Sequence, residues 1–161
     1  MTKKPLQFKL NGADKAVFVD DGQNLLDVLR RGIGDLSPKY GCGQGTCGAC
    51  TVLVDGEPYL SCLVLAETVE GREISTTGGL ARDVGLDPLQ DAFMDGFAAQ
   101  CGFCTPGMLM AAKALLDRNP NPSRDDVIEA ISGNICRCTG YEPIINAILD
   151  AAQRGSGLRT A

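Results

Sequence analysis

The chain has 161 residues, of which 44% are hydrophobic, and this length fits one ordinary domain or two small ones with a folded core. Its formal net charge of −5 argues against a nucleic-acid-binding surface, which needs a basic face to neutralise phosphates. We see neither an apolar signal sequence nor a stretch near the roughly 20 apolar residues of a membrane span, so we expect a cytoplasmic protein.

The first half of the chain has the patterns of strands and turns. Asn11-Gly12 and Asp55-Gly56 are turn dipeptides between apolar segments, which predicts two hairpins. The apolar residues of segment 24–32 have helical spacing, which predicts one helix. The predicted strands cover residues 6–10, 16–19, 51–54, 58–63 and 70–76. We therefore expect a small mixed sheet with one helix.

The second half of the chain has the patterns of helices. A linker-like stretch over residues 78–87 separates it from the first half. The predicted helices begin at Pro88, at Pro106, after Ser123 and after Thr139. Asp126 and Glu142 have the spacing of capping-box partners for the last two helices. The sequence therefore predicts a four-helix unit.

An apolar stripe lies on the first of these helices. Leu89, Phe93 and Phe97 occur at positions i, i+4 and i+8. Because a helix buries such a stripe against its neighbours, we expect all three side chains in the core and assign them no chemical role.

Half of the eight cysteines lie in the first half of the chain, in a C-x4-C-x2-C pattern with one more distant member: Cys42, Cys47, Cys50 and Cys62. This is the spacing of plant-type ferredoxins, which bind a [2Fe-2S] cluster. Nearby glycines allow positive φ, so that backbone N–H groups can turn inward as an anion-binding nest. An all-cysteine cluster carries about −2 charge when oxidised and about −3 when reduced, so inward N–H groups favour the reduced state.

The other cysteines form a C-x2-C pair and a C-x-C pair: Cys101, Cys104, Cys136 and Cys138. Each pair precedes a predicted helix, so two helix N-termini with partial positive charge would point toward one anionic centre. A C-x-C chelate is less typical of structural zinc than paired C-x2-C knuckles. The pattern favours a second iron–sulfur cluster.

Other uses of the cysteines are less favoured by the sequence. The chain has no histidine, which excludes mixed Cys/His zinc sites, Rieske centres and histidine-ligated haem. Two all-cysteine zinc sites stay open as an alternative, whereas disulfides are disfavoured in a chain without a secretory signal. A cysteine nucleophile is disfavoured because no histidine can act as its base and no cysteine lies outside the two quartets.

Three long motifs resemble the iron–sulfur part of the xanthine dehydrogenase family of molybdenum hydroxylases. The motifs are GCGQGTCGACTV at residues 41–52, QCGFCTPG at residues 100–107 and NICRCTGY at residues 134–141. The resemblance implies an α+β chain. It consists of a β-grasp [2Fe-2S] ferredoxin-like domain over residues 1–78, followed by a four-helix [2Fe-2S]-binding domain over residues 79–161.

The resemblance implies an electron-transfer subunit. In this family a molybdenum atom on molybdopterin hydroxylates a substrate with oxygen from water. Two electrons then pass through the cluster of the helical domain, the ferredoxin-like cluster and usually a flavin. A chain of 161 residues has no room for the other domains, so we expect a large molybdopterin-binding subunit and a medium FAD-binding subunit as partners. A free two-cluster ferredoxin and a zinc-stapled interaction module are the alternatives.

The resemblance also implies roles for individual residues. All eight cysteines match cluster ligands of the family, and no catalytic residue is expected on this chain. Gln100 matches a glutamine that hydrogen-bonds the pterin, and Cys138 matches the ligand nearest the pterin, where electrons would enter. Arg137 would raise the cluster potential or pair with a partner subunit, and Tyr141 would be a packed anchor. Substrate pockets of the family lie on the molybdenum subunit, so the sequence leaves the substrate open.

Overall fold

The computed structural model describes residues 3–81 and 85–158. A five-stranded mixed sheet in the order β2-β1-β5-β3-β4 forms the first part, which we call the β half (residues 3–80). The strands are β1 Lys3–Leu10, β2 Ala13–Asp20, β3 Thr51–Val54, β4 Glu57–Leu60 and β5 Glu73–Ser75. β1 and β5 pair in parallel, and the other pairs are antiparallel. The predicted mixed sheet is confirmed, although β4 and β5 are shorter than predicted.

Both predicted hairpin turns are present. Asn11 and Asp55 have φ values of 53° and 51°, and the glycine after each has positive φ as well. This conformation suits the twist of a two-residue hairpin and is available to Asn, Asp and Gly at low cost. The side chains of β1 alternate between exposed and buried from Pro5 onward, so its buried face contributes Leu6, Phe8 and Leu10 to the core.

The predicted first helix is present in an altered form. It consists of α1 (Leu25–Asp27), with Asn24 as its N-cap, and a π-helical turn η1 (Val28–Ile33) that ends at Gly34 in the left-handed region. The Gly34 N–H donates to the carbonyl of Leu29, five residues earlier. Short 3₁₀ segments, η2 (Ala66–Val69) and η3 (Thr77–Gly79), flank β5. Neither the π-helical turn nor the 3₁₀ segments followed from the periodicity of the sequence.

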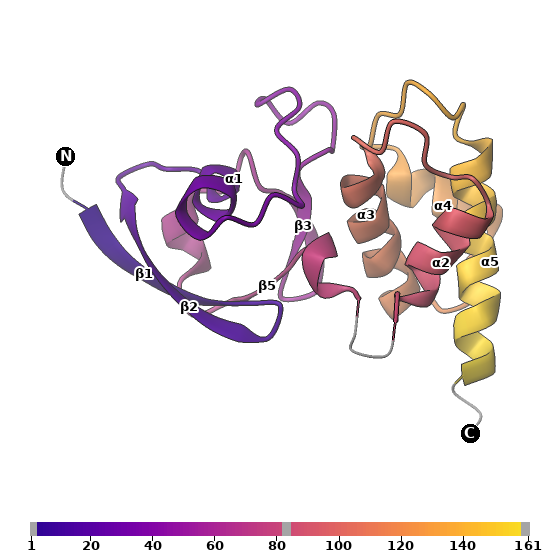
Figure 1. Cartoon of the computed structure of the whole chain (residues 1–161), viewed down its shortest axis with the longest axis horizontal. Coiled ribbons are helices and arrows are strands. Elements are labelled where there is room, and N and C mark those ends of the chain that lie inside the picture. The colour runs from indigo at the N-terminus through magenta and orange to yellow at the C-terminus, as the bar shows by residue number, and fades with distance from the viewer. Residues whose placement is uncertain (1–2, 82–84, 159–161) are drawn as a thin grey trace.

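The second part, which we call the helical half (residues 85–158), contains the predicted helices. They are α2 Pro88–Asp95, α3 Thr105–Arg118, α4 Arg124–Ile131 and α5 Glu142–Leu158. Figure 1 shows α3 beside β3, with α2, α4 and α5 on the side away from the sheet. The core of this half includes Met108, Ala112, Val127 and Ile148. None of the helices described is long and apolar enough to cross a membrane.

Two sequence predictions for the helical half are wrong. Leu89 and Phe93 are buried, but Phe97 is 81% exposed, because α2 ends at Asp95 and Phe97 follows in the left-handed region at φ 51°. The i, i+4, i+8 spacing therefore does not place Phe97 on the buried face of α2. Glu142 is not the third residue of its helix but the first, and its carboxylate pairs with Arg124 at 2.5 Å in place of a capping box.

The capping box of α4 is present and gives a prediction. The Asp126 N–H donates to Ser123 Oγ, and the Ser123 N–H donates to Asp126 Oδ2 at 2.8 Å. The backbone N–H and the hydroxyl of Ser123, which both donate to Asp126 Oδ2, lower the pKa of Asp126 from its ordinary value. We expect Ser123→Ala to reduce the free energy of unfolding by about 1 kcal/mol at pH 7. A carboxylate whose pKa is lower in the folded state stabilises it above the unfolded pKa, and this contribution is lost as the pH falls through the folded pKa.

Urea unfolding of wild type and Ser123→Ala at pH 7 and pH 3 measures both effects. The difference between the two proteins is expected to shrink at the lower pH. An equal difference at both pH values would contradict a contribution of ionised Asp126 to this cap.

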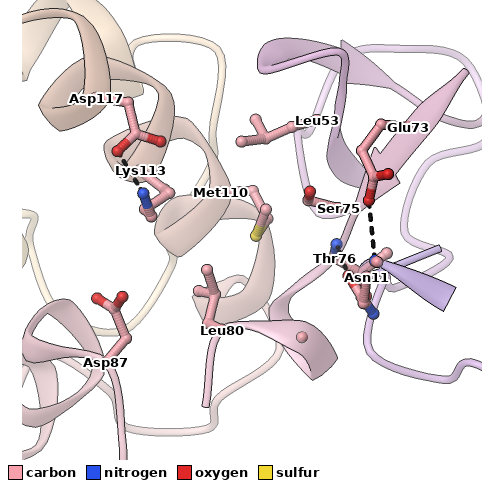
Figure 2. Close-up of a pocket in the computed structure, with 12 residues that line it drawn as sticks. Asn11, Leu53, Glu73, Ser75, Thr76, Leu80, Asp87, Met110, Lys113 and Asp117 are labelled. Carbon is pink, nitrogen blue, oxygen red and sulfur yellow. Dashed lines mark hydrogen bonds and ion pairs between the residues drawn. The ribbon is translucent and has the colours of Figure 1, made fainter. Parts of the chain in front are cut away.

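The β half and the helical half contact one another through α3 and β3. Leu53 of β3 packs into the helical core, and Thr77 Oγ1 donates to the Pro106 carbonyl at 3.0 Å. A cavity of about 220 Å³ lies between them (Figure 2). Glu73 and Thr76 line it from one side and Lys113 of α3 from the other, where its ammonium group pairs with a neighbouring aspartate. No cysteine lines this cavity, which is therefore separate from the cysteine loops described below.

Candidate metal centres

The first cysteine quartet lies at the edge of the β half that faces the helices. Cys42, Cys47 and Cys50 belong to the loop between η1 and β3, and Cys62 follows β4. The thiols interact in two pairs, Cys42 with Cys47 and Cys50 with Cys62. Ser61, which is fully buried, donates from Oγ to the Cys50 carbonyl at 2.7 Å and ties the loop to the end of β4. The structure thus brings the predicted residues together in two pairs, and Ser61 connects the loop that holds Cys50 to the segment that holds Cys62.

The second quartet lies at one end of the helical half. Cys101 and Cys104 precede α3, and Cys136 and Cys138 lie between α4 and α5. The Sγ atoms of Cys138 and Cys101 are 3.6 Å apart, and the thiol of Cys104 interacts with that of Cys136. The Cys101–Cys138 pair is exposed, whereas Cys136 is buried and Cys104 half-buried.

The two-by-two arrangement fits the ligand set of a two-iron cluster. In an all-cysteine [2Fe-2S] cluster each iron takes two thiolates. Two sulfurs on one tetrahedral metal with bonds of about 2.3 Å lie roughly 3.7 Å apart, and the Cys101–Cys138 separation of 3.6 Å matches this. The residues present therefore fit the expected group.

Backbone and side-chain donors point at the thiols. The Thr46 N–H donates to Cys42 Sγ at 3.2 Å, and bonds from Thr46 and Gln44 lower the pKa of Cys42 to about 6. Burial disfavours the thiolate of Cys136, but contacts with Thr139 outweigh it, and the pKa is lowered. The Thr139 hydroxyl lies 3.1 Å from Cys136 Sγ. Such donors stabilise thiolates and an anionic cluster.

The space around the thiols also fits a bound group. A Cβ atom at Gly41 would lie 2.7 Å from Cys47 Sγ, so only glycine leaves room for that sulfur. Thr105 Oγ1, one residue after Cys104, is buried without a hydrogen-bond partner among the described residues. Burial raises the pKa of Cys50 to about 11 and that of Cys104 to about 12, so without a metal these thiols keep their protons. Metal binding must displace these protons and supply the counter-charge.

Two family models match this chain. One family model, a 2Fe-2S iron-sulfur cluster binding domain, matches residues 8–81, and a second, a [2Fe-2S] binding domain, matches residues 76–149. The nicotine 6-hydroxylase small subunit of Paenarthrobacter nicotinovorans is 49% identical over 91% of this chain and 88% of its own length. The chain belongs to the iron–sulfur subunits of the xanthine dehydrogenase family.

Other relatives agree with this assignment. The nicotinate dehydrogenase small FeS subunit of Eubacterium barkeri is 44% identical over 96% of this chain and 98% of its own length. The crystal structure of quinoline 2-oxidoreductase from Pseudomonas putida 86 superposes with a TM-score of 0.94, at 46% identity over 99% of each chain. The predicted family and the α+β fold with two [2Fe-2S]-binding parts are confirmed.

As an iron–sulfur subunit of this family, the chain is the electron-transfer component of a multi-subunit oxidoreductase and carries two [2Fe-2S] clusters. Bound in the two parts of the chain, the clusters would supply one-electron transfer. The predicted electron-transfer function is confirmed, and the free ferredoxin and the zinc module give way to it.

The remaining predicted residues of this iron–sulfur subunit lie around the second quartet. Gln100 and Arg137 are exposed. Tyr141 is a packed anchor as predicted, because its ring contacts the helical core and its hydroxyl accepts from the Cys136 N–H at 3.0 Å. The sequence reasoning missed Thr139 as a partner of Cys136 and Asn134 as a link between the two loops. Both are short polar residues within three positions of Cys136, and this proximity was the signal in the sequence that could have identified them.

Proposed function

We propose that this subunit relays electrons between a molybdopterin site on a large partner and an FAD-binding medium subunit. The helical half would bind one [2Fe-2S] cluster through Cys101, Cys104, Cys136 and Cys138, and the β half the other through Cys42, Cys47, Cys50 and Cys62. The assignment is supported by the 3.6 Å separation of Cys101 Sγ and Cys138 Sγ and by the two [2Fe-2S] domain models, each of which covers one quartet.

Electrons would enter at the exposed pair of the helical half. Cys101 and Cys138 are exposed, whereas Cys136 is buried and Cys104 is half-buried. Gln100, directly before Cys101, is also exposed and offers both an amide donor and a carbonyl acceptor to a pterin ring. We assign Gln100 and Cys138 as the contacts to the pterin of the partner.

The exposed side chain of Phe97 supports the binding of a large partner close to Gln100. Phe97 holds an exposed ring in a left-handed conformation that costs about 1 kcal/mol for a residue with a side chain, and it lies three residues before Gln100. We expect Phe97→Asn to raise the free energy of unfolding of this chain by roughly 0.5–1 kcal/mol, because asparagine tolerates positive φ. The same change is expected to weaken binding of the large subunit by about tenfold, as for an aromatic anchor.

Binding to the purified large subunit and urea unfolding measure these two effects. Phe18→Asn is the matched control, because Phe18 is 70% exposed on β2, the edge strand of the sheet remote from the helices. The control is expected to leave binding unchanged. Equal binding of wild type and Phe97→Asn would contradict the placement of the partner.

The substrate would be selected by the partner, not by this chain. Relatives named for nicotine, nicotinate, aldehyde and xanthine enzymes are 44–49% identical to it, although their substrates differ. A residue set common to such enzymes serves electron transfer in all of them. The aldehyde oxidoreductase of Megalodesulfovibrio gigas matches over 16% of its length, as one part of a much longer chain.

We further propose a division into residues 1–78 and 79–161 and a cytoplasmic location. The division is supported by separate hydrophobic clusters, one around Leu29 and Ile74 and one around Met108 and Ile148. The location is supported by eight free cysteines, which must stay reduced to receive iron.

The test is metal analysis and EPR spectroscopy of the complex purified through this chain. Two [2Fe-2S] clusters predict four irons per chain and, after dithionite reduction, two distinguishable EPR signals. Molybdenum and FAD in the same particle would support the proposed partners. Clusters without molybdenum or larger partners would favour a free ferredoxin, and zinc without an EPR signal would overturn the relay.

A further inference from the structure

The two cysteine loops are joined by a direct backbone hydrogen bond. The Ile135 N–H donates to the Cys47 carbonyl at 2.9 Å. Under the proposed function, Cys47 is a ligand of the cluster in the β half, and Ile135 directly precedes Cys136, a ligand of the other cluster. One hydrogen bond and a few covalent bonds thus connect ligands of different clusters, although the residues are 88 positions apart in sequence.

Asn134 holds this connection from one side. Its side chain is 5% exposed, and Nδ2 donates to the Gly48 carbonyl at 2.9 Å and to Thr51 Oγ1 at 3.3 Å. Thr51 Oγ1 in turn donates to the same Gly48 carbonyl at 2.7 Å. The Asn134 N–H donates to the Ile131 carbonyl at the end of α4. The residue therefore fastens the end of α4 to the loop of the β half, one position away from Ile135.

Glycines bring the backbones together at this place. A Cβ atom at Gly48, which has φ +70°, would lie 2.5 Å from the Gly133 carbonyl oxygen. A Cβ atom at Gly107, in the first turn of α3, would lie 2.2 Å from the Gly48 carbonyl oxygen. We call Gly48, Thr51, Gly107 and Asn134 the junction. At both glycines the nearest atom is a backbone carbonyl oxygen, which cannot turn aside as the end of a flexible side chain can.

A buried amide of this kind is stable only with its partners in place. Neither Asn134 nor Thr51, also 5% exposed, has access to water that could replace a lost bond. Apolar packing between the halves, such as that of Leu53, would hold them together but would not fix the register of one loop against the other. Directional hydrogen bonds at Gly48 do fix it.

We propose that Asn134 is a positioning residue for electron transfer between the two clusters. By holding the Gly48 carbonyl, it keeps the adjacent Cys47 carbonyl bonded to the Ile135 N–H and so sets the coupling between the cluster ligands. One electron leaves the cluster of the helical half, which is oxidised, and reduces the cluster of the β half; no proton moves and no covalent bond changes. This role rests on the proposed ligand assignment.

The test compares Asn134→Leu with wild type in the purified multi-subunit complex. Leucine has a similar size but cannot donate, so the Gly48 carbonyl loses its tie to α4. We expect four irons and both EPR signals to persist, because no ligand changes. The magnetic interaction between the two reduced clusters is expected to fall several-fold, and the rate of electron transfer between them is expected to fall as well, because the hydrogen-bonded connection between their ligands is weakened.

Ser61→Ala is the matched control. Ser61 is fully buried and its hydroxyl donates to the carbonyl of Cys50, also a proposed ligand, but both residues lie within the β half. A merely structural role for Asn134 predicts the same magnetic interaction and rate in Asn134→Leu as in Ser61→Ala, and this result would overturn the proposal.

Loss of a cluster in the variant or in wild type has its own interpretation. If Asn134→Leu loses a cluster, Thr51→Val replaces it. This change keeps Asn134 but removes the bond from Thr51 Oγ1 to the Gly48 carbonyl and the bond from Asn134 to Thr51 Oγ1. A reduced magnetic interaction supports the role and an unchanged one overturns it. If wild type itself lacks two clusters, the proposed ligand assignment fails. Failure of the positioning role alone leaves wild type with both clusters and their EPR signals.

Discussion

Replacing Gly107 with alanine is expected to destabilise the chain by about 3 kcal/mol. The added methyl group would lie 2.2 Å from the Gly48 carbonyl oxygen and 3.1 Å from its carbon. These are backbone atoms of a loop tied by three hydrogen bonds, so the loop cannot yield without breaking them. The first turn of α3 and the cysteine loop of the β half must therefore separate.

Urea unfolding and iron content of the purified chain check this expectation. Gly155→Ala is the matched control, because Gly155 also lies within a helix, α5, but has no atom within 4 Å of an added Cβ. This change is expected to stabilise the chain by up to about 1 kcal/mol, the usual gain of alanine over glycine in a helix. Similar stabilities for the two variants would show that the loops can separate at low cost.

The sequence was sufficient for the fold because local signals and global architecture agree. Asn11 and Asp55 stand where hairpins need positive φ, and Asp87 and Ser123 stand where helices need N-caps. Each signal acts over a few residues and is therefore visible without a structure. Phe97 was mispredicted because periodicity cannot show that a helix has already ended, at Asp95.

The cysteine quartets were also visible in the sequence, but their pairing was not. Spacing shows that Cys101 and Cys104 lie on one loop, yet the contacts are Cys101 with Cys138 and Cys104 with Cys136, across segments more than 30 residues apart. The junction at Asn134 was equally hidden, because it depends on how α4 ends relative to a loop of the other half. Such contacts come from tertiary packing and leave no periodic trace in the sequence.

Replacing one cysteine of a quartet is expected to remove one cluster and to leave the other. We expect Cys136→Ala to halve the iron content from four to two per chain and to remove one of the two EPR signals. Cys136 shares contacts with Cys104 and lies on the loop that closes the helical quartet, so the remaining three thiols cannot complete two tetrahedral irons. Electron transfer through the complex should then stop, while its assembly is retained.

Cys42→Ala is the reciprocal control for this experiment. Cys42 pairs with Cys47 in the loop of the β half, where bonds from Thr46 and Gln44 favour its thiolate. Its loss is expected to remove the other EPR signal and to leave the one that Cys136→Ala abolishes. Iron content and EPR of the two variants therefore assign each signal to one half of the molecule. Loss of both signals in either variant would mean that the two clusters form only together, through the junction that connects their loops.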